Sequence, residues 1–169
     1  MSALSLAALR RALTFGLTLG LTLAVLPAAG ADPVPYPKGY RQWTHVKSMV
    51  IQPGHALYEA FGGIHHLYAN PQAERGYAGG GKFPDGSVIV FDLLEARTAD
   101  NTLTEGTRKV VGVMVKDSRR YAATGGWGYE AFKGDSTSER AVGANAAQAC
   151  HACHMAQKDR DYVFSTWRR

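Results

Sequence analysis

The segment Ser87-Val88-Ile89-Val90-Phe91-Asp92-Leu93-Leu94 predicts a strand and thus a fold that contains a β-sheet. It is rich in β-branched and aromatic side chains, which are typical of a buried or half-buried strand. Pro84-Asp85-Gly86 stands just before it and predicts a turn, because proline presets φ and glycine accepts a positive φ. The sequence therefore predicts a strand over residues 87–94 that begins at a tight turn.

Four more strands are predicted on either side of this one. They are rich in aromatic or β-branched side chains and cover residues 40–51, 64–68, 109–115 and 127–132. Loops are predicted at residues 100–106 and 134–138. The connections are short, and short connections favour antiparallel pairing.

Two helices complete the prediction. Asn70 is a suitable N-cap and Pro71 a suitable first residue for a short helix over residues 71–77. Residues 141–157 are rich in alanine and predict a helix near the C-terminus. The expected fold class is mainly β (α+β), an antiparallel sheet of about five strands with a short helix and a C-terminal helix.

The N-terminal residues have the layout of a secretory signal peptide. Two arginines precede an uncharged apolar run over residues 13–28, and Ala29-Gly30-Ala31 has the small-x-small pattern of a cleavage site. An uncleaved membrane anchor is the alternative, but a spanning helix needs about 20 apolar residues. We therefore predict a signal peptide over residues 1–31, cleaved after Ala31, export to the periplasm, and a single domain over residues 32–169.

The charge of the chain argues against one class of partner. The formal net charge is +5 at pH 7, and the lysine and arginine residues that produce it are scattered. Nucleic-acid binding proteins cluster such residues on one face, often beside aromatic side chains. No nucleic-acid partner is therefore expected.

The predicted C-terminal helix contains Cys150-His151-Ala152-Cys153-His154, the Cys-x-x-Cys-His signature of c-type haem attachment. Two thiols at this spacing reach the two vinyl groups of one porphyrin, and the next histidine presents an imidazole to the iron. A redox-active pair is a weaker alternative because it is expected early in a βαβ unit, and a zinc site needs two separated ligand pairs. We therefore predict one covalent heme c on Cys150 and Cys153, with His154 as the proximal iron ligand.

The ligand on the opposite side of the iron has to come from upstream or be absent. Met155 is the one methionine after the motif, and it is too close to His154 to reach the other face of the ring. The upstream candidates are histidines, namely His45, His55, His65 and His66. The last two are neighbours on a predicted strand and point to opposite faces, so at most one of them can face the haem.

Several motifs resemble those of the cytochrome P-460 family. They are Tyr36-Pro37-Lys38-Gly39-Tyr40-Arg41-x-Trp43, Phe83-Pro84-Asp85-Gly86, Val115-Lys116-Asp117-Ser118, the Cys-x-x-Cys-His signature and Lys158-Asp159-x-Asp161-Tyr162-Val163-Phe164. Together they cover essentially the whole of residues 32–169. The resemblance implies a largely antiparallel β fold, a homodimer and a five-coordinate haem with one open face.

This family has two functional branches. The cytochrome P-460 enzymes oxidise hydroxylamine and carry a lysine bonded to the porphyrin and a distal carboxylate. The cytochrome c′-beta branch lacks that bond and binds diatomic gases in a pocket capped by phenylalanines. The resemblance matches the lysine to Phe91, the carboxylate to Gly112 and a second capping aromatic to Phe61. Lys82, just before the turn, is the alternative cross-linking lysine in a shifted register.

These departures from the enzyme pattern favour the cytochrome c′-beta branch. We predict a gas-binding haem protein, rather than a hydroxylamine oxidoreductase, with Phe61 and Phe91 in its distal pocket. Nitric oxide or carbon monoxide is the expected ligand, and a small redox partner is a further prediction. Taken without the resemblance, both phenylalanines are better explained as core residues, the usual place of phenylalanine. Hydroxylamine oxidation and simple electron transfer remain alternative functions.

Overall fold

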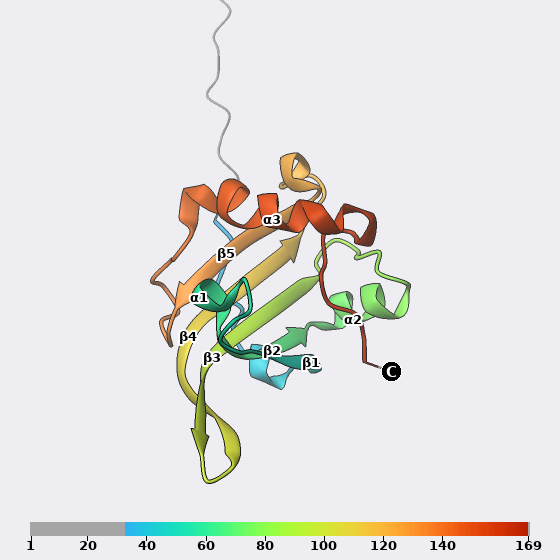
Figure 1. The fold of residues 1–169 in the computed structure, drawn as a ribbon. Helices are drawn as coiled ribbons and strands as arrows, with labels where there is room; N and C mark the ends of the chain where they lie inside the picture. Colours follow the sequence, from blue (N-terminus) through green and yellow to red (C-terminus); the bar gives the residue numbers. More distant parts are fainter. Residues whose placement is uncertain (1–32, 169) are drawn as a thin grey trace, which may run out of the picture. The chain divides into compact units, whose positions relative to one another are not determined.

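A single antiparallel sheet dominates the computed structural model, which describes residues 33–168 (Figure 1). Its strands are β1 (Thr44–Ile51), β2 (Gly63–Ala69), β3 (Val88–Ala99), β4 (Thr102–Lys116) and β5 (Trp127–Lys133). They lie in the order β1-β2-β3-β4-β5, so each strand pairs with its neighbours along the chain. The predicted mainly β fold with an antiparallel five-stranded sheet is confirmed. The predicted signal peptide lies outside the described residues.

The longest hairpin corrects the prediction of a loop at residues 100–106. β3 and β4 stay paired out to Ala99 and Thr102, so only Asp100 and Asn101 form the turn. Both turn residues have positive φ, 49° and 59°, which is the geometry of a two-residue hairpin turn. The tip of this hairpin is exposed on both faces, so its sequence lacks the apolar alternation that predicts a strand.

The first predicted strand also begins later than expected. Residues 40–42 form a short 3-10 turn, η1 (Tyr40–Gln42), and β1 starts at Thr44. Gly39 enters this turn with a φ of 74°, and the backbone N–H of Trp43 donates to the carbonyl of Tyr40. These local hydrogen bonds replace the sheet pairing that a strand would require.

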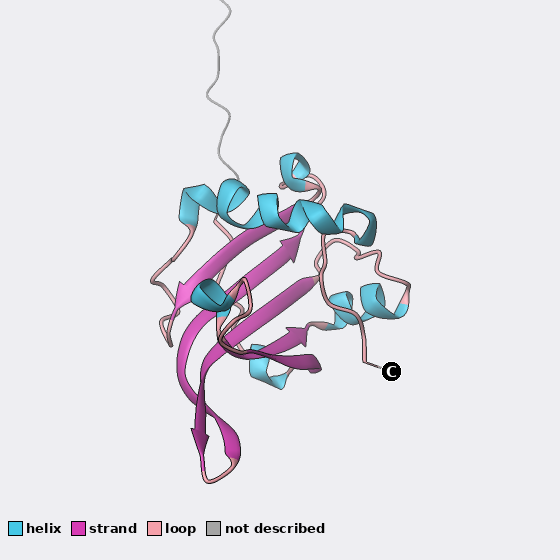
Figure 2. Ribbon diagram, in the orientation of Figure 1, coloured by secondary structure: helices cyan, strands magenta, loops and turns pink. Residues whose placement is uncertain are grey.

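Helices are short throughout the described part of the chain (Figure 2). They comprise α1 (Tyr58–Phe61), α2 (Pro71–Ala78), α3 (Ala152–His154), the 3-10 turns η2 (Ala122–Thr124), η3 (Gly143–Asn145) and η5 (Met155–Arg160), and the π-helical turn η4 (Ala147–His151). α2 matches the prediction, with Asn70 accepting a capping hydrogen bond from the N–H of Ala73. Among residues 33–168, no helix has the length and apolar character needed to cross a membrane.

The predicted C-terminal helix is broken into short pieces and starts later than residue 141. The backbone N–H of Ala141 donates to the carbonyl of Ala131 on β5, and those of Val142 and Gly143 donate to the Glu130 carboxylate. Because these donors are already engaged by β5, a regular helix cannot begin there. The helical segment that follows lies beside β5 (Figure 1).

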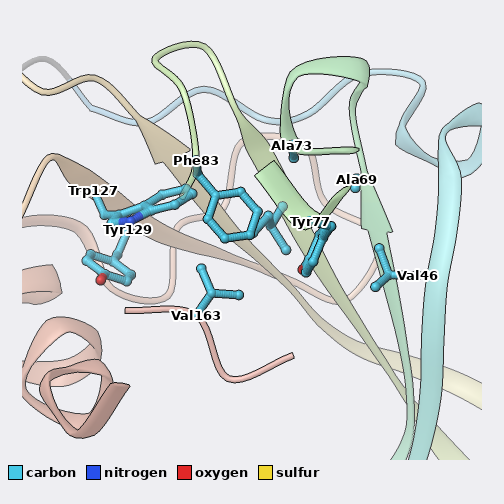
Figure 3. Close-up of a cluster of buried hydrophobic side chains, with 9 residues drawn as sticks. Val46, Ala69, Ala73, Tyr77, Phe83, Trp127, Tyr129 and Val163 are labelled. Carbon is cyan, nitrogen blue, oxygen red and sulfur yellow. The ribbon is translucent and has the colours of Figure 1, made fainter. Parts of the chain in front are cut away.

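Side chains on the two faces of the sheet form two separate cores. The first packs Ile89 of β3 and the α2 side chains Ala73 and Tyr77 with Phe83, Trp127, Tyr129, Val163, Val46 and Ala69 (Figure 3). The second contains Val34, Tyr40, Val90, Val111, Val113, Tyr121 and Phe132. Since neighbouring strand residues point to opposite faces, Phe91 and Leu93 lie on the same face as Ile89. We call this the helix face, because the C-terminal helical segment packs against it.

Candidate functional site

His154 is held in the orientation that a metal-bound histidine needs. Its Nδ1 lies 2.6 Å from the carbonyl oxygen of Tyr162, which can only accept, so Nδ1 carries the proton. Nε2 is left as the ring nitrogen able to ligate iron, in the arrangement that metal-binding histidines commonly adopt. Burial lowers the pKa of His154, against the opposing effect of the Tyr162 hydrogen bond. The imidazole is therefore neutral at pH 7, which is the ligating form.

Asp161 fixes the carbonyl that orients this histidine. It has a left-handed backbone, with φ 52°, and directly precedes Tyr162. One carboxylate oxygen lies 2.6 Å from Nζ of Lys116, and the other accepts from the backbone N–H of Phe83 at 3.0 Å. The indole N–H of Trp127 donates to the Asp161 carbonyl at 2.8 Å. The turn after the helical segment is thus bound to two strands of the sheet, through Lys116 and Trp127, and to the connection between α2 and β3, through Phe83.

The two cysteines lie on the same segment as His154 and are free thiols. Cys150 is half-buried against the first core, whereas Cys153 is exposed. Burial raises the pKa of Cys150, with smaller contributions from Glu130 and Cys153, so its thiol is protonated at pH 7. Two unpaired thiols beside an oriented imidazole are what covalent attachment of a c-type haem requires.

Glu130 of β5 anchors the chain just before this segment. Its carboxylate accepts from Nη1 of Arg140 at 2.8 Å and from the backbone N–H groups of Ala131, Val142 and Gly143 at 2.9, 3.2 and 3.0 Å. Burial favours the protonated form, but these hydrogen bonds outweigh it and lower the pKa of Glu130. The charged form is therefore the one that the folded protein stabilises.

Replacing Glu130 by glutamine is expected to lower the free energy of unfolding by about 2 kcal/mol at pH 7, because a charged acceptor of several hydrogen bonds is lost. A carboxylate with a lowered folded-state pKa stabilises the protein above its ordinary pKa of about 4.3. That contribution disappears as the pH falls through the folded-state pKa. Urea unfolding at several pH values should therefore show the difference between the two proteins shrinking towards low pH. Glu139→Gln, at an exposed ion pair, should change little at any pH.

On the helix face, Phe91 lies at the centre of an aromatic cluster. Its ring centroid is 5.8 Å from that of Phe61 and 4.6 Å from that of His65, both edge to face. Phe61 is 40% exposed, and Phe91 is partly buried and absent from both cores, so neither is an ordinary core residue. The structure thus brings together the two predicted pocket residues and one of the candidate histidines.

Beside Phe91, towards β4 and β5, the helix face of the sheet carries small side chains. Gly112 is the direct partner of Phe91 on β4, and Ala131 is the partner of Gly112 on β5. A Cβ atom at Gly112 would lie 3.3 Å from the Phe91 ring, so the ring leans over the glycine. Tyr129 lies two residues before Ala131 on the same face of β5. The centroid of its ring is 5.1 Å from that of the His154 ring. Small side chains therefore separate the oriented histidine from the aromatic cluster, which suits a flat porphyrin.

The other candidate histidines are engaged elsewhere. His66 faces away from Phe91 and contacts Glu105 and Ser48, at 2.6 and 2.7 Å. His45 contacts the same Ser48 hydroxyl, and Nδ1 of His55 accepts from a backbone N–H at the start of α1. His65 is therefore the candidate that lies in the aromatic cluster.

Lys82 lies in the connection between α2 and β3 and is exposed. It stands before β3 rather than on it, whereas the strand position matched to the cross-linking lysine holds Phe91. The structure therefore places no lysine at the matched position on β3.

Sequence reasoning missed three supports of this site. They are the Asp161–Lys116 pair, the Glu130 acceptor and the contact of His65 with α1. Asp161 and Lys116 do lie in motifs that the sequence singles out, but neither motif says that the two side chains meet. Only the folded chain brings together residues this far apart in sequence.

Comparison with known proteins agrees with this geometry. No curated protein matches the sequence. The family model for cytochrome P460 matches residues 37–165, which is most of the chain and includes both the cysteine motif and the aromatic cluster. The oriented His154, the free thiols and the small side chains beside Phe91 are consistent with the haem that such proteins bind. The chain belongs to the cytochrome P460 family and is a haem-binding cytochrome.

Proposed function

We propose that this cytochrome is an exported, periplasmic protein that binds nitric oxide or another diatomic gas at a five-coordinate heme c. Cys150 and Cys153 would hold the porphyrin through thioether bonds, and His154 would be the proximal iron ligand. The hydrogen bond from Nδ1 of His154 to the Tyr162 carbonyl supports this role, because it leaves Nε2 for the metal. When bound, the haem supplies the iron site at which a diatomic ligand can coordinate.

The observation that carries the gas-binding proposal is the pair formed by Phe91 and Gly112. These are the positions matched to the lysine and the carboxylate of the hydroxylamine-oxidising branch, and they are direct partners across β3 and β4. Neither side chain can donate a proton, accept one or form a bond to a porphyrin. The matched positions therefore supply neither the cross-link nor the general base that the enzyme branch uses.

An apolar cover also selects among ligands. Phe61 and Phe91 offer no hydrogen-bond partner, so a hydrated anion or water molecule loses hydrogen bonds when it enters. A small diatomic gas has little hydration to lose. The aromatic pair therefore favours nitric oxide and carbon monoxide over charged ligands.

Oxidation of hydroxylamine is the second candidate, and His65 is the observation that favours it. This side chain is 3% exposed and lies against Phe91, so a group able to carry a proton is present near the proposed distal site. In this reading His65 takes the place of the missing carboxylate. A neutral imidazole can accept a proton, and histidine is the commonest general base in enzymes.

An optical spectrum of the purified holoprotein distinguishes these functions. Gas binding predicts an ordinary high-spin c-type spectrum of the ferrous protein, which shifts when carbon monoxide or nitric oxide is added. A red-shifted Soret band would indicate a lysine cross-link and contradict the proposed branch. Sharp low-spin bands in both oxidation states would instead indicate six-coordinate iron and electron transfer.

Phe91→Ala is expected to speed the association of carbon monoxide with the ferrous protein by about tenfold, equivalent to about 1.4 kcal/mol in the barrier. The reason is that the substitution removes the large side chain that would cover the iron on the helix face. Laser flash photolysis of the carbon monoxide complex measures this rate. Phe132→Leu, on the opposite face of the sheet, is the control for general loosening and should leave the rate unchanged. An unchanged rate in Phe91→Ala would show that Phe91 does not cover the iron.

A homodimer and a small redox partner belong to the same proposal. The homodimer is expected from the family resemblance, and the redox partner is a further expectation for a haem protein that changes oxidation state. Analytical ultracentrifugation of the holoprotein tests the first, and a single sedimenting species of monomer mass would contradict it.

A further inference from the structure

We propose that His65 and Lys109 are positioning residues that hold the short helix α1, and with it Phe61, over the open side of the iron site. They would thereby set how fast a diatomic ligand enters. This inference rests on the proposed function for its consequence, but its structural part concerns contacts within the chain alone.

α1 has little of its own to keep it in place. It spans only Tyr58–Phe61, and none of its residues is buried. Leu57, just before it, and Phe61, at its end, are 46% and 40% exposed. An isolated helix of this length is unstable in water, because nucleation is unfavourable and too few hydrogen bonds form. Its position must therefore be set by contacts with other elements.

Two side chains from the sheet supply such contacts at the C-terminal end of α1. Nε2 of His65, on β2, donates to the carbonyl oxygen of Phe61 at 2.6 Å. Nζ of Lys109, on β4, donates to the carbonyl oxygen of the next residue, Gly62, at 2.8 Å. The last carbonyls of a helix have no partner within it, and a positive charge is favourable at that end. The two donors thus fix the end of α1 that carries Phe61.

The backbone conformation at Gly63, between α1 and β2, is tightly constrained. Gly63 has a φ of 132°, and a Cβ atom there would lie 2.1 Å from the carbonyl oxygen of Leu94 on β3. The chain therefore passes directly from α1 into β2 against the neighbouring strand. Movement of the Phe61 and Gly62 backbone away from the sheet would have to break the His65 and Lys109 hydrogen bonds.

His65 links the two aromatic side chains of the proposed cover. It binds the backbone of Phe61, and its ring packs edge to face on Phe91 with centroids 4.6 Å apart. Burial lowers the pKa of His65, and nearby Lys109 and His66 lower it further, against the effect of the Phe61 hydrogen bond. The ring is therefore neutral at pH 7, and its proton lies on Nε2 because a carbonyl can only accept.

The test compares four variants of the holoprotein. His65→Leu and Lys109→Met each remove one donor, and His65→Gln restores an N–H donor on a side chain of similar reach. Lys133→Met is the matched control, because Lys133 is an exposed lysine on β5 whose Nζ contacts Glu139 rather than α1. Hydrogen exchange at the amides of Phe61 and Gly62, which donate to Leu57 and Tyr58, reports opening of α1. Flash photolysis with carbon monoxide reports ligand entry.

We expect His65→Leu to raise both the exchange rate of these amides and the rate of carbon monoxide association by roughly fivefold, the effect of losing one hydrogen bond. Lys109→Met should raise both by roughly twofold, since the hydrogen bond of an exposed lysine is weaker. His65→Gln should return both rates most of the way to the wild-type values, and Lys133→Met should not change them.

Unchanged exchange and association rates in both His65→Leu and Lys109→Met would overturn the proposal. Faster exchange with unchanged gas entry would show that α1 is anchored as described but does not cover the iron, which also overturns it. If His65→Leu fails to fold, Lys109→Met carries the test. Failure of the wild-type protein to bind carbon monoxide would remove the proposed function and the entry role together, while the exchange rates still decide the anchoring.

Discussion

Changing both Cys150 and Cys153 to serine is expected to abolish covalent haem attachment completely. A serine hydroxyl does not form the thioether that joins a cysteine to a porphyrin vinyl group. Both sulfur atoms are free thiols on the segment that carries His154. The sequence contains two cysteines, so no third cysteine can replace them. Mass spectrometry of the denatured protein checks this, since the wild type should retain the mass of one haem and the double variant should not.

Each single variant should keep one thioether and therefore still retain haem after denaturation. His151→Gln is the matched control, because it alters the interior of the motif without touching either thiol or His154. It should keep the wild-type mass. Haem retained by the denatured double variant would mean that another side chain forms a covalent bond, and Lys82 would then be the first residue to replace.

Much of the sheet can be predicted from the sequence because its central strands are buried on at least one face. Val90 and Val111 are fully buried, and runs of such residues have few alternatives to a strand. The turn at Pro84-Asp85-Gly86 is predictable for a different reason. Gly86 has a φ of 83°, which side chains rarely adopt, so the residue type reveals the conformation.

The exposed elements could not be predicted in the same way. The end of the β3–β4 hairpin is held by backbone pairing and by local side-chain contacts, such as the Thr102 hydroxyl donating to the Ala99 carbonyl, and its polar side chains resemble those of a loop. The C-terminal segment has the composition of a regular helix, yet its first N–H groups are taken by Glu130 and β5. Strand pairing in the hairpin, and contacts with β5 in the C-terminal segment, override the local preference, and such contacts are not visible in one sequence.

The candidate site shows the same division. The spacing of Cys150, Cys153 and His154 is local and predicts the side of the haem to which they bind. The opposite side depends on the register of β2, β3 and β4, which places His65, Phe91 and Gly112 next to one another. Sequence alone allowed either His65 or His66 to face the haem. The pairing of His65 with Leu93 places His65 on the helix face, because Leu93 shares that face with Phe91.

Asp161→Ala is expected to lower the free energy of unfolding by about 3 kcal/mol, since it leaves the buried Lys116 without its carboxylate and the N–H of Phe83 without its acceptor. Alanine is also less favourable than aspartate in the left-handed backbone conformation at this position. Asp161→Asn keeps an oxygen acceptor and tolerates that conformation, so it should cost about half as much. Urea unfolding measures both values.

The same substitution should also change the orientation of His154, because Asp161 holds the turn that carries the Tyr162 carbonyl, the acceptor for His154. We expect Asp161→Ala to shift the spectrum of the ferrous holoprotein as the proximal ligand loses its fixed orientation, and Asp161→Asn to shift it less. Asp159→Ala, at an exposed carboxylate two residues earlier, is the control and should change neither stability nor spectrum. If Asp161→Ala proved no more destabilising than Asp159→Ala, the ion pair with Lys116 would not be what holds the C-terminal turn. The orientation of His154 would then have to come from the packing of its ring against Tyr129 and Phe164.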